Sequence, residues 1–338
     1  MEPSQFPVYH KLTLYLLNLG AIGMSKQLDS LFVSVIVPVF NDAQRLRLCL
    51  EALATQTYGQ GKDQENQAAR YEVIVVDNAS AASERIPDLV AEFSCATYAY
   101  ESLPGSYTAR NCGVSIAKGD VLAFTDADCI PAKDWIEKGV SYLTKIPNCG
   151  LVAGKINLFF QKDKANPIEL YESVTAFPQQ KLLDQQKGAA TANVFTFKSV
   201  MDAVGPFNAQ LRSQGDVEWG RRVFEAGYQQ FYAEDVCVAH PARYTLQQLH
   251  RRTLRLAGGT FGRFIRPDQS VLQRNLTFTR ILLADLIPPV NFAIKAFKDE
   301  RLNGFKQKSV VSLVLLWVRY VSAMEKARLR LGGVPNRG

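Results

Sequence analysis

The chain has 338 residues, of which 47% are hydrophobic and 21% are charged, with a formal net charge of +7. These values are ordinary for a globular protein and exclude a disordered, collagen-like or polytopic membrane protein. The excess of Lys and Arg favours anionic partners such as nucleotide diphosphates, nucleic acid or acidic lipid headgroups, among which composition does not choose.

The first half of the sequence alternates predicted strands and helices. Residues 1–30 look like a tail or a peripheral helix, and residues 31–40 are a β-branched run typical of a buried parallel strand. Asn41 and Asp42 follow this strand and are expected to cap a helix. A polar loop over 59–70 leads into a second buried strand over 71–76, which ends at Asp77.

Further strands over 96–100 and 120–125 and helices over 87–93 and 108–117 continue this alternation. Strands that are continuously apolar and alternate with helices predict a doubly wound parallel sheet. Ligands bind beyond the carboxyl ends of the strands in such sheets. Because Asn41, Asp77 and Asp126 each follow a strand, we expect them to converge on one edge.

After residue 150 the pattern is mixed, with a strand over 151–159, and from Tyr244 onward it is helical. Pro288 and Pro289 divide one helical stretch from the next. We therefore divide the chain into an N-terminal segment (1–30), a catalytic domain (31–242) and a basic, apolar helical region (243–338).

The six cysteines include no Cys-X-X-Cys pair, and the chain has three His, so no clustered zinc ligands are evident. We interpret the cysteines as reduced side chains of a cytosolic protein. No convincing signal peptide and no apolar run of about 20 residues is found. We expect a soluble catalytic part in the cytoplasm, with peripheral attachment to the inner face of the cell membrane as an alternative.

Asp126 and Asp128 are two carboxylates at the end of the strand over 120–125. Such a pair can share Mg²⁺ or Mn²⁺, which usually takes one or two protein carboxylates together with phosphate oxygens. The cation would stabilise the charge on a leaving diphosphate. The alternative is a solvated acidic turn, and the position at a strand end favours the metal site.

Asp77 and His240 also follow predicted strands. The Asp77 carboxylate could accept hydrogen bonds from the base or ribose of a nucleotide, and the alternative is an Asx-turn or helix-capping role. His240 is either a metal ligand or a structural residue. Their positions favour neither interpretation decisively.

Asp216 and Glu218 lie in one acidic segment followed by Arg221 and Arg222. A hydroxyl that attacks a sugar must lose its proton, so one of these acids would act as general base. The arginines would pair with phosphate or with the acids. The alternative is an amphipathic helix start, where acidic residues face the positive end of the helix dipole.

The chain resembles the family 2 glycosyltransferases with the GT-A fold in seven segments, which follow in order across roughly residues 31–242. They are VSVIVPVFN (33–41), IVVDNAS (74–80), TARNCG (108–113), GDVLAFTDAD (119–128), VGPF (204–207), GDVE (215–218) and AGY (226–228). The resemblance implies an α/β fold, a GT-A type Rossmann-like α/β/α sandwich with a mostly parallel central sheet and a C-terminal helical region.

The resemblance also implies the reaction. It is the inverting transfer of a sugar from a nucleotide-diphosphate donor, with UDP as the expected nucleotide and Mn²⁺ or Mg²⁺ as the implied cofactor. The basic, apolar C-terminal region suggests a glycan or lipid-linked acceptor, in cell-envelope or extracellular polysaccharide synthesis.

Individual roles follow from the same resemblance. The nucleotide sugar would be held by Asp77, Arg110, Asp126, Arg222 and the backbone around Pro38, Val39 and Asn41. The metal would be held by Asp128, with Asp126 and His240 near it. Asp216 would be the general base.

The chain departs from the family pattern at three places. Gly215 precedes Asp216 where the family usually has an acid, and Glu218 stands where Asp is more frequent, so Glu218 is the alternative base. The Gln-X-X-Arg-Trp motif of processive synthases is absent, because QQLHRR (247–252) lacks the Trp. We therefore expect a non-processive enzyme that adds one sugar per encounter.

Two alternative functions are compared with the sequence pattern of this chain. A nucleotidyltransferase would carry a Gly-rich, basic phosphate loop after its first strand, where this chain has PVFND (38–42), and no Gly-X-Gly-X-X-Gly supports an NAD enzyme. The second alternative is a basic nucleotide- or membrane-binding protein on the same fold with impaired catalytic residues.

The C-terminal region has a cluster of arginines without the aromatic residues or motifs of nucleic-acid readers, so we expect membrane headgroups or donor phosphates as its target. Apolar residues 310–317, flanked by Lys306, Lys308 and Arg319, predict either a helix in a membrane interface or a core helix, packed on the catalytic domain or in a homodimer. The arginines are Arg243, Arg251, Arg252, Arg255, Arg263 and Arg266.

Overall fold

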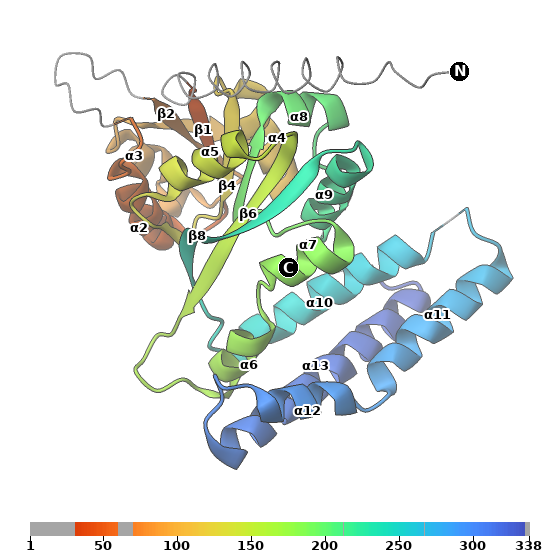
Figure 1. Ribbon diagram of the computed structural model, residues 1–338. Coiled ribbons are helices and arrows are strands. Elements are labelled where there is room, and N and C mark those ends of the chain that lie inside the picture. The colour runs from red at the N-terminus through yellow and green to blue at the C-terminus, as the bar shows by residue number, and fades with distance from the viewer. Residues whose placement is uncertain (1–30, 60–69, 212, 267, 335–338) are drawn as a thin grey trace, which may run out of the picture.

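The computed structural model describes residues 31–59, 70–211, 213–266 and 268–334 (Figure 1). Two expectations lie outside these residues: the tail or peripheral helix over 1–30 and nearly all of the polar loop over 59–70. In the described chain, an α/β body holds the sheet, and a layer of long helices lies below it in the view of Figure 1.

The body contains one sheet with the strand order β3-β2-β1-β4-β7-β6-β8-β5. The first four strands are parallel, whereas β7 is antiparallel to both of its neighbours and β5 is antiparallel to β8. The expected mostly parallel sheet is thus confirmed, with two reversed strands. The strands are β1 (Val33–Val39), β2 (Tyr71–Asp77), β3 (Ala96–Tyr100), β4 (Val121–Thr125), β5 (Ile130–Pro131), β6 (Cys149–Phe159), β7 (Asn193–Phe197) and β8 (Gln229–Pro241).

Helices cover both faces of the sheet, so the expected α/β/α sandwich is confirmed. Successive residues of β1 alternate between the two cores: Val35 and Val37 pack in one and Ile36 packs in the other. The first core is covered by α2 (Ala43–Ala54), α3 (Ile86–Ala91) and α5 (Trp135–Lys145), and the second by α4 (Ser106–Ile116), α7 (Gln179–Gln186), α8 (Lys198–Val204) and α9 (Gly215–Glu225).

The start of α2 differs from the expected side-chain cap. Asp42 occupies the capping position but makes no capping hydrogen bond, because its carboxylate binds Arg45 at 2.7 Å. The Ala43 amide donates instead to Glu84, 2.8 Å away, in the short 3₁₀ helix η1 (Ala82–Glu84). An acid from the neighbouring loop therefore satisfies this end of the helix.

A register shift lets β6 and β8 continue beyond the rest of the sheet. Gly154 and Lys155 of β6 lie opposite Ala233 and Cys237 of β8, so β8 contains extra residues at this point. Asn193 fills the break: its side-chain amide donates to the Lys155 and Val236 carbonyls, each at 2.9 Å, and its oxygen accepts from Trp135. A side chain at Gly154 would meet the Val236 oxygen at 2.3 Å, so this approach requires glycine.

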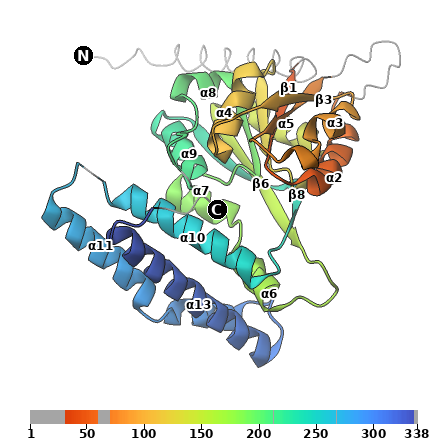
Figure 2. The same cartoon turned by 180° about the vertical axis from the view of Figure 1, so that it is seen from behind.

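The C-terminal region is helical, as predicted. Figures 1 and 2 show α10 between the α/β body and the outer helices α11 to α13. The predicted division at Pro288 and Pro289 separates α11 from α12. The helices are α6 (Pro167–Thr175), α10 (Leu246–Phe264), α11 (Val271–Leu286), α12 (Val290–Lys298) and α13 (Gly304–Arg330).

Part of α13 forms the core of this helical layer. Val311 is fully buried, and Val314, Leu315 and Trp317 pack with it against Leu249 of α10. One face of this stretch is thus a packed core face, whereas Leu313 and Leu316 on its other face are 63% and 45% exposed. Further exposed apolar side chains of the layer lie on α11 and α12.

No single helix among the described residues is both long and apolar enough to cross a bilayer. One pair, α11 with α12, meets those criteria jointly by length and composition, although the two helices are bent by 40° at their junction.

Candidate active site

The carboxyl ends of β1, β2 and β4 meet at one edge of the sheet, as the sequence predicts. Pro38 and Val39 lie opposite Val76 and Asp77 in the parallel register. Asn41 joins the turns beyond β1 and β2. Its backbone amide donates to Ser80 Oγ at 2.9 Å, and its side-chain Oδ1 accepts from the Ala81 backbone amide at 2.7 Å. Asn tolerates the left-handed backbone found at Asn41, where φ is 49°.

Asp77 is buried at this edge, with 5% of its surface exposed. Its Oδ1 accepts from the Ser80 amide at 2.9 Å, and its Oδ2 accepts from the Tyr98 hydroxyl at 3.3 Å. The bond to Ser80 is the turn contact that the sequence left as the alternative role. A turn contact and a contact to a nucleotide are compatible, because a carboxylate accepts about four hydrogen bonds.

Arg110 connects two of the predicted site residues. It projects from α4, is 4% exposed, and forms an ion pair with Asp126 at the end of β4. The Arg110 charge also lowers the pKa of Asp216, which places it near that carboxyl as well. Removing one partner of a buried ion pair typically costs about 3–5 kcal/mol, so Asp126 and Arg110 depend on each other.

The two carboxylates of the Asp-Ala-Asp segment have different partners. Whereas Asp126 pairs with Arg110, Asp128 faces His240, with Oδ1 and Nε2 3.4 Å apart. The short pairing of β5 with β8 produces this approach, because Ile130 lies opposite Ala239. Burial raises the pKa of Asp128, although His240 and Arg45 counteract the shift.

His240 and Asp128 suit a divalent cation. His240 Nδ1 lies 2.8 Å from the Pro241 carbonyl, so a proton on Nδ1 leaves the Nε2 lone pair directed at Asp128. A lone pair and a carboxylate oxygen that face each other need a proton or a metal ion between them. Mn²⁺ accepts oxygen and imidazole ligands, so these residues fit the expected cofactor.

Cys129 joins this group, which the sequence did not indicate. In the described chain, ligand atoms of Asp128, Cys129 and His240 lie within 4.8 Å of one another. Burial raises the pKa of Cys129 well above its usual range, which disfavours the thiolate that a metal ion would bind. A neutral thiol is a poor ligand for a hard cation, and we therefore assign the metal to the oxygen and nitrogen donors.

Asp216 begins α9 on the same side of the sheet as α4. Its Oδ1 accepts from the Tyr107 hydroxyl at 3.1 Å and from the Val217 amide at 3.0 Å. Burial raises the pKa of Asp216, and the charge of Arg110 and these hydrogen bonds oppose the shift. Burial also raises the pKa of Tyr107, so its hydroxyl remains a donor. The arrangement suits a proton acceptor whose pKa lies above that of an ordinary carboxyl.

Glu218 and Arg222 are placed differently from the other predicted site residues. They form an ion pair one helical turn apart on α9, with Nε and Oε1 3.0 Å from each other. Arg222 also donates to the carbonyls of Val204, Gly205 and Pro206 at the end of α8. These contacts engage the Arg222 guanidinium where α9 packs on α8. They do not bring it to Asp126 or Asp128.

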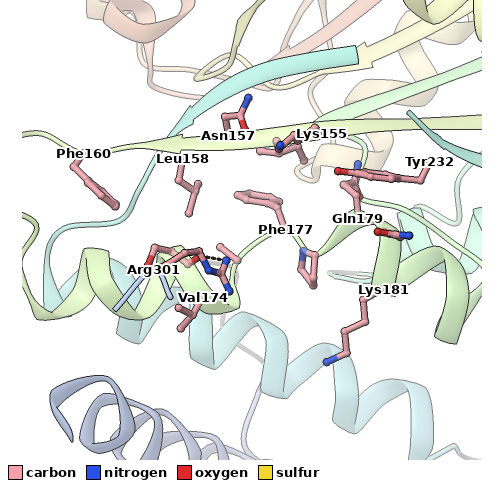
Figure 3. Close-up of a pocket in the computed structure, with 15 residues that line it drawn as sticks. Lys155, Asn157, Leu158, Phe160, Val174, Phe177, Gln179, Lys181, Tyr232 and Arg301 are labelled. Atoms are coloured by element: carbon pink, nitrogen blue, oxygen red, sulfur yellow. Dashed lines mark hydrogen bonds between the residues drawn. The ribbon is translucent and has the colours of Figure 1, made fainter. Parts of the chain in front are cut away.

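A cavity of about 620 Å³ adjoins the metal-binding group. Phe177 lines it and also packs against His240, with ring centroids 4.5 Å apart. Figure 3 shows Phe177, which lies in the loop that joins α6 to α7, beneath β6 with Asn157, Gln179 and Tyr232 around it. The lining thus combines aromatic rings with amide and hydroxyl groups.

The structure thus unites Asn41, Asp77, Arg110, Asp126, Asp128, Asp216 and His240 near the strand ends. Sequence reasoning missed Tyr107 and Cys129. Tyr107 lies just before the helix predicted over 108–117, but the observed α4 begins at Ser106. Its position three residues before Arg110, on the same helix face, is the signal that could have identified it. Cys129 carried no such signal, because its proximity to His240 arises from the pairing of β5 with β8.

The protein-family model described as "Glycosyl transferase family 2" matches residues 34–204 of this chain. Glycosyltransferase AglE of Haloferax volcanii is 33% identical over 292 residues, which span 85% of this chain and 91% of that protein. The pre-mycofactocin glycosyltransferase of Mycobacterium tuberculosis is 28% identical over 226 residues, 64% of this chain and 44% of its own length.

Two solved structures share the fold. Mannosyltransferase PcManGT from Pyrobaculum calidifontis, in complex with GDP-Man and Mn²⁺, aligns with a TM-score of 0.52 at 19% identity, over 90% of this chain and 76% of that one. Residues 1–349 of TarS from S. aureus, in complex with UDP-GlcNAc, align with a TM-score of 0.50 at 15% identity, over 90% of this chain and 93% of that one.

The metal assignment predicts the behaviour of two single variants. Asp128→Asn should weaken Mn²⁺ binding by about tenfold or more, because an amide replaces the anionic oxygen beside His240. Cys129→Ala should leave the affinity unchanged, since the thiol is protonated and does not bind the ion. Mn²⁺ titration followed by electron paramagnetic resonance measures both, and equal affinities in all three proteins would place the metal elsewhere.

Proposed function

This chain belongs to glycosyltransferase family 2, and we propose that it transfers a sugar from a nucleotide-diphosphate donor, with UDP as nucleotide, to a glycan or lipid-linked acceptor with inversion. The observation that carries the proposal is Asp216, a carboxyl of raised pKa held by Tyr107 near the Arg110–Asp126 ion pair. Inversion in one displacement requires a single base for the acceptor hydroxyl, and Asp216 has the environment of one.

The donor is bound at the strand ends in this proposal. The backbone over Pro38–Asn41 and the Asp77 carboxylate hold the nucleotide, and Arg110 lies where the diphosphate charge would be. Support comes from the hydrogen bonds that fix Asn41 to the turn after β2, because they preorganise both loops before the donor arrives.

Asp128 and His240 would hold Mn²⁺ or Mg²⁺, with Asp126 beside them. When bound, such a cation stabilises the negative charge that develops on the leaving diphosphate. The ion pair with Arg110 orients Asp126, so its carboxylate can serve the cation or the ribose. Arg222 has no part in this proposal, since its donors are occupied at the end of α8.

The acceptor hydroxyl gives its proton to Asp216 as it attacks. The Tyr107 hydroxyl and the Val217 amide donate to one oxygen of Asp216 and orient the carboxylate for this proton transfer. The cavity behind Phe177 supports a sugar-bearing acceptor, because aromatic rings and amide groups are what hydroxyl-rich ligands bind. We place the reaction in cell-envelope or extracellular polysaccharide synthesis.

We further propose that the protein acts in the cytoplasm as a peripheral protein on the inner face of the membrane. All six cysteines are free thiols, in keeping with a reducing compartment. Residues 243–338 carry eighteen Lys and Arg against five Asp and Glu, although the whole chain has a net charge of only +7. This asymmetry matches an anionic bilayer.

The outer helices offer an apolar surface to that bilayer. α11 has no buried residue, and Val271 and Leu272 are 71% and 69% exposed. Exposed apolar side chains continue through Ile287 and Val290 to Phe305, with exposed cations among them. The cations are Arg280, Lys295, Lys298 and Lys306. A surface that mixes both kinds of side chain is typical of proteins that lie on a membrane.

The proposed reaction is tested with a panel of nucleotide sugars and an extract of lipid-linked and free glycans. Asp216→Asn should lower transfer by about 10²- to 10⁴-fold while nucleotide binding stays intact, because only the proton acceptor is lost. Glu218→Gln is the matched control and should retain activity, since Glu218 pairs with Arg222. A reversed pattern would make Glu218 the base, and transfer that resists EDTA would remove the metal from the reaction.

The pH dependence follows from the raised pKa of Asp216. Because the base must be ionised, kcat/KM should rise with pH through this raised pKa, above the usual Asp value of about 4. Tyr107→Phe removes a hydrogen bond that favours the ionised carboxyl, so the acidic limb should move upward by roughly half to one pH unit. Tyr98→Phe, which alters only the Asp77 contact, should leave the limb in place. A limb unmoved by Tyr107→Phe would contradict the assignment.

Membrane attachment is tested by flotation with vesicles that contain anionic or only zwitterionic lipid. The wild type should float with anionic vesicles. The double variant with Leu272→Asp and Ile287→Asp should not float, because the new charges resist burial in lipid. Leu48→Asp with Ile116→Asp, at exposed sites of the α/β body, is the control. Substitution is preferable to truncation, since α13 packs on α10. A wild type that dimerises through this face and does not float would refute the proposal.

A further inference from the structure

Helix α10 is attached to the loop that precedes Asp216. A side chain at Gly259 would meet Ser213 Oγ at 1.7 Å, so the helix and the loop are in direct contact there. Ser213 Oγ also donates to the Arg255 carbonyl at 3.3 Å, and Arg263 donates to Gln214 at 3.0 Å. One side of α10 is therefore fixed against the candidate active site.

Arg252 and Arg255 on this side of α10, with Arg243 just before the helix, carry more positive charge than the neighbouring acidic side chains neutralise. Arg243 and Arg252 lie 2.7 Å and 3.6 Å from the carboxylate oxygens of Glu172, which is fully buried. Arg255 lies near enough to Arg243 for their charges to repel. Glu172 is the one acid that forms an ion pair with any of these three arginines in the described residues.

Arg255 differs from the other two because its side chain forms no hydrogen bond or ion pair within the described part of the chain. The carboxylates whose charge acts on it are Asp216 and Asp126. Burial lowers the pKa of Arg255 and of Arg252. Arg255 is nevertheless partly exposed, so its guanidinium is accessible to an anion that supplies the missing hydrogen-bond partner.

We propose that Arg255, together with Arg243 and Arg252, forms a subsite for a phosphate group at the edge of the catalytic site. A guanidinium binds phosphate through two parallel hydrogen bonds, which an unpaired Arg255 is free to make. Glu172 holds Arg243 and Arg252 in place, so the cluster of three keeps an excess positive charge. The inference rests on the proposed function, because the phosphate belongs either to the donor diphosphate or to an acceptor whose sugar is linked to lipid through phosphate.

Binding measurements with Mn²⁺ present separate these two sources. The donor probes are uridine, UMP and UDP, and the acceptor probes are octyl phosphate and octanol. Arg255→Ala should weaken binding of one phosphate probe by about tenfold or more and leave uridine and octanol unaffected. Arg255→Lys should lose less, because it keeps the charge but not the paired donors. Arg251→Ala is the matched control, since Arg251 is an exposed arginine of the same helix.

Each result has a definite meaning. A loss confined to UDP assigns the subsite to the donor, and a loss confined to octyl phosphate assigns it to the acceptor. The proposal is overturned if Arg255→Ala matches Arg251→Ala, if uridine binding falls equally, or if the wild type binds neither phosphate probe. Failure of the proposed function would look different: phosphate binding would depend on Arg255 while no nucleotide sugar supported transfer.

Discussion

The buried charge of Arg110 is the constraint on which the catalytic edge depends. A guanidinium that is 4% exposed needs an ionised partner, and Asp126 is that partner. The pairing distinguishes the two acids of the Asp-Ala-Asp segment, because it leaves Asp128 to face His240. The same charge moderates the effect of burial on the pKa of Asp216, so one side chain of α4 influences the nucleotide, metal and base positions together.

The extension of β6 and β8 beyond the rest of the sheet determines two further features, which are the position of His240 and the border of the cavity. The break at Gly154, filled by Asn193, lets β6 and β8 continue, and β8 thereby delivers His240 to Asp128. Phe177 packs against the ring of His240 and borders the cavity. The metal ligands and the proposed acceptor cavity are consequently linked through a single aromatic contact.

The helical layer carries a net positive charge, whereas the α/β body carries a net negative charge. Its inner helix α10 contacts the loop before Asp216, and its outer helices expose apolar and basic side chains. An enzyme that binds a membrane through the outer helices would hold its catalytic edge at a fixed distance from the lipid. The arginines of α10 lie in the layer between the α/β body and the outer helices.

The sequence by itself determined the first four strands, their alternation with helices and the convergence of Asn41, Asp77 and Asp126, because continuous β-branched runs and polar strand ends are local signals. Through the family resemblance it also predicted Asp216 as the general base and Asp128 as a metal ligand. The tertiary structure decided which neighbour each side chain meets. It assigned Arg222 to Glu218 and the end of α8, brought Cys129 to His240, and left Arg255 without a partner. These outcomes depend on contacts between residues far apart in the chain, and no local pattern of apolar and polar residues specifies such contacts.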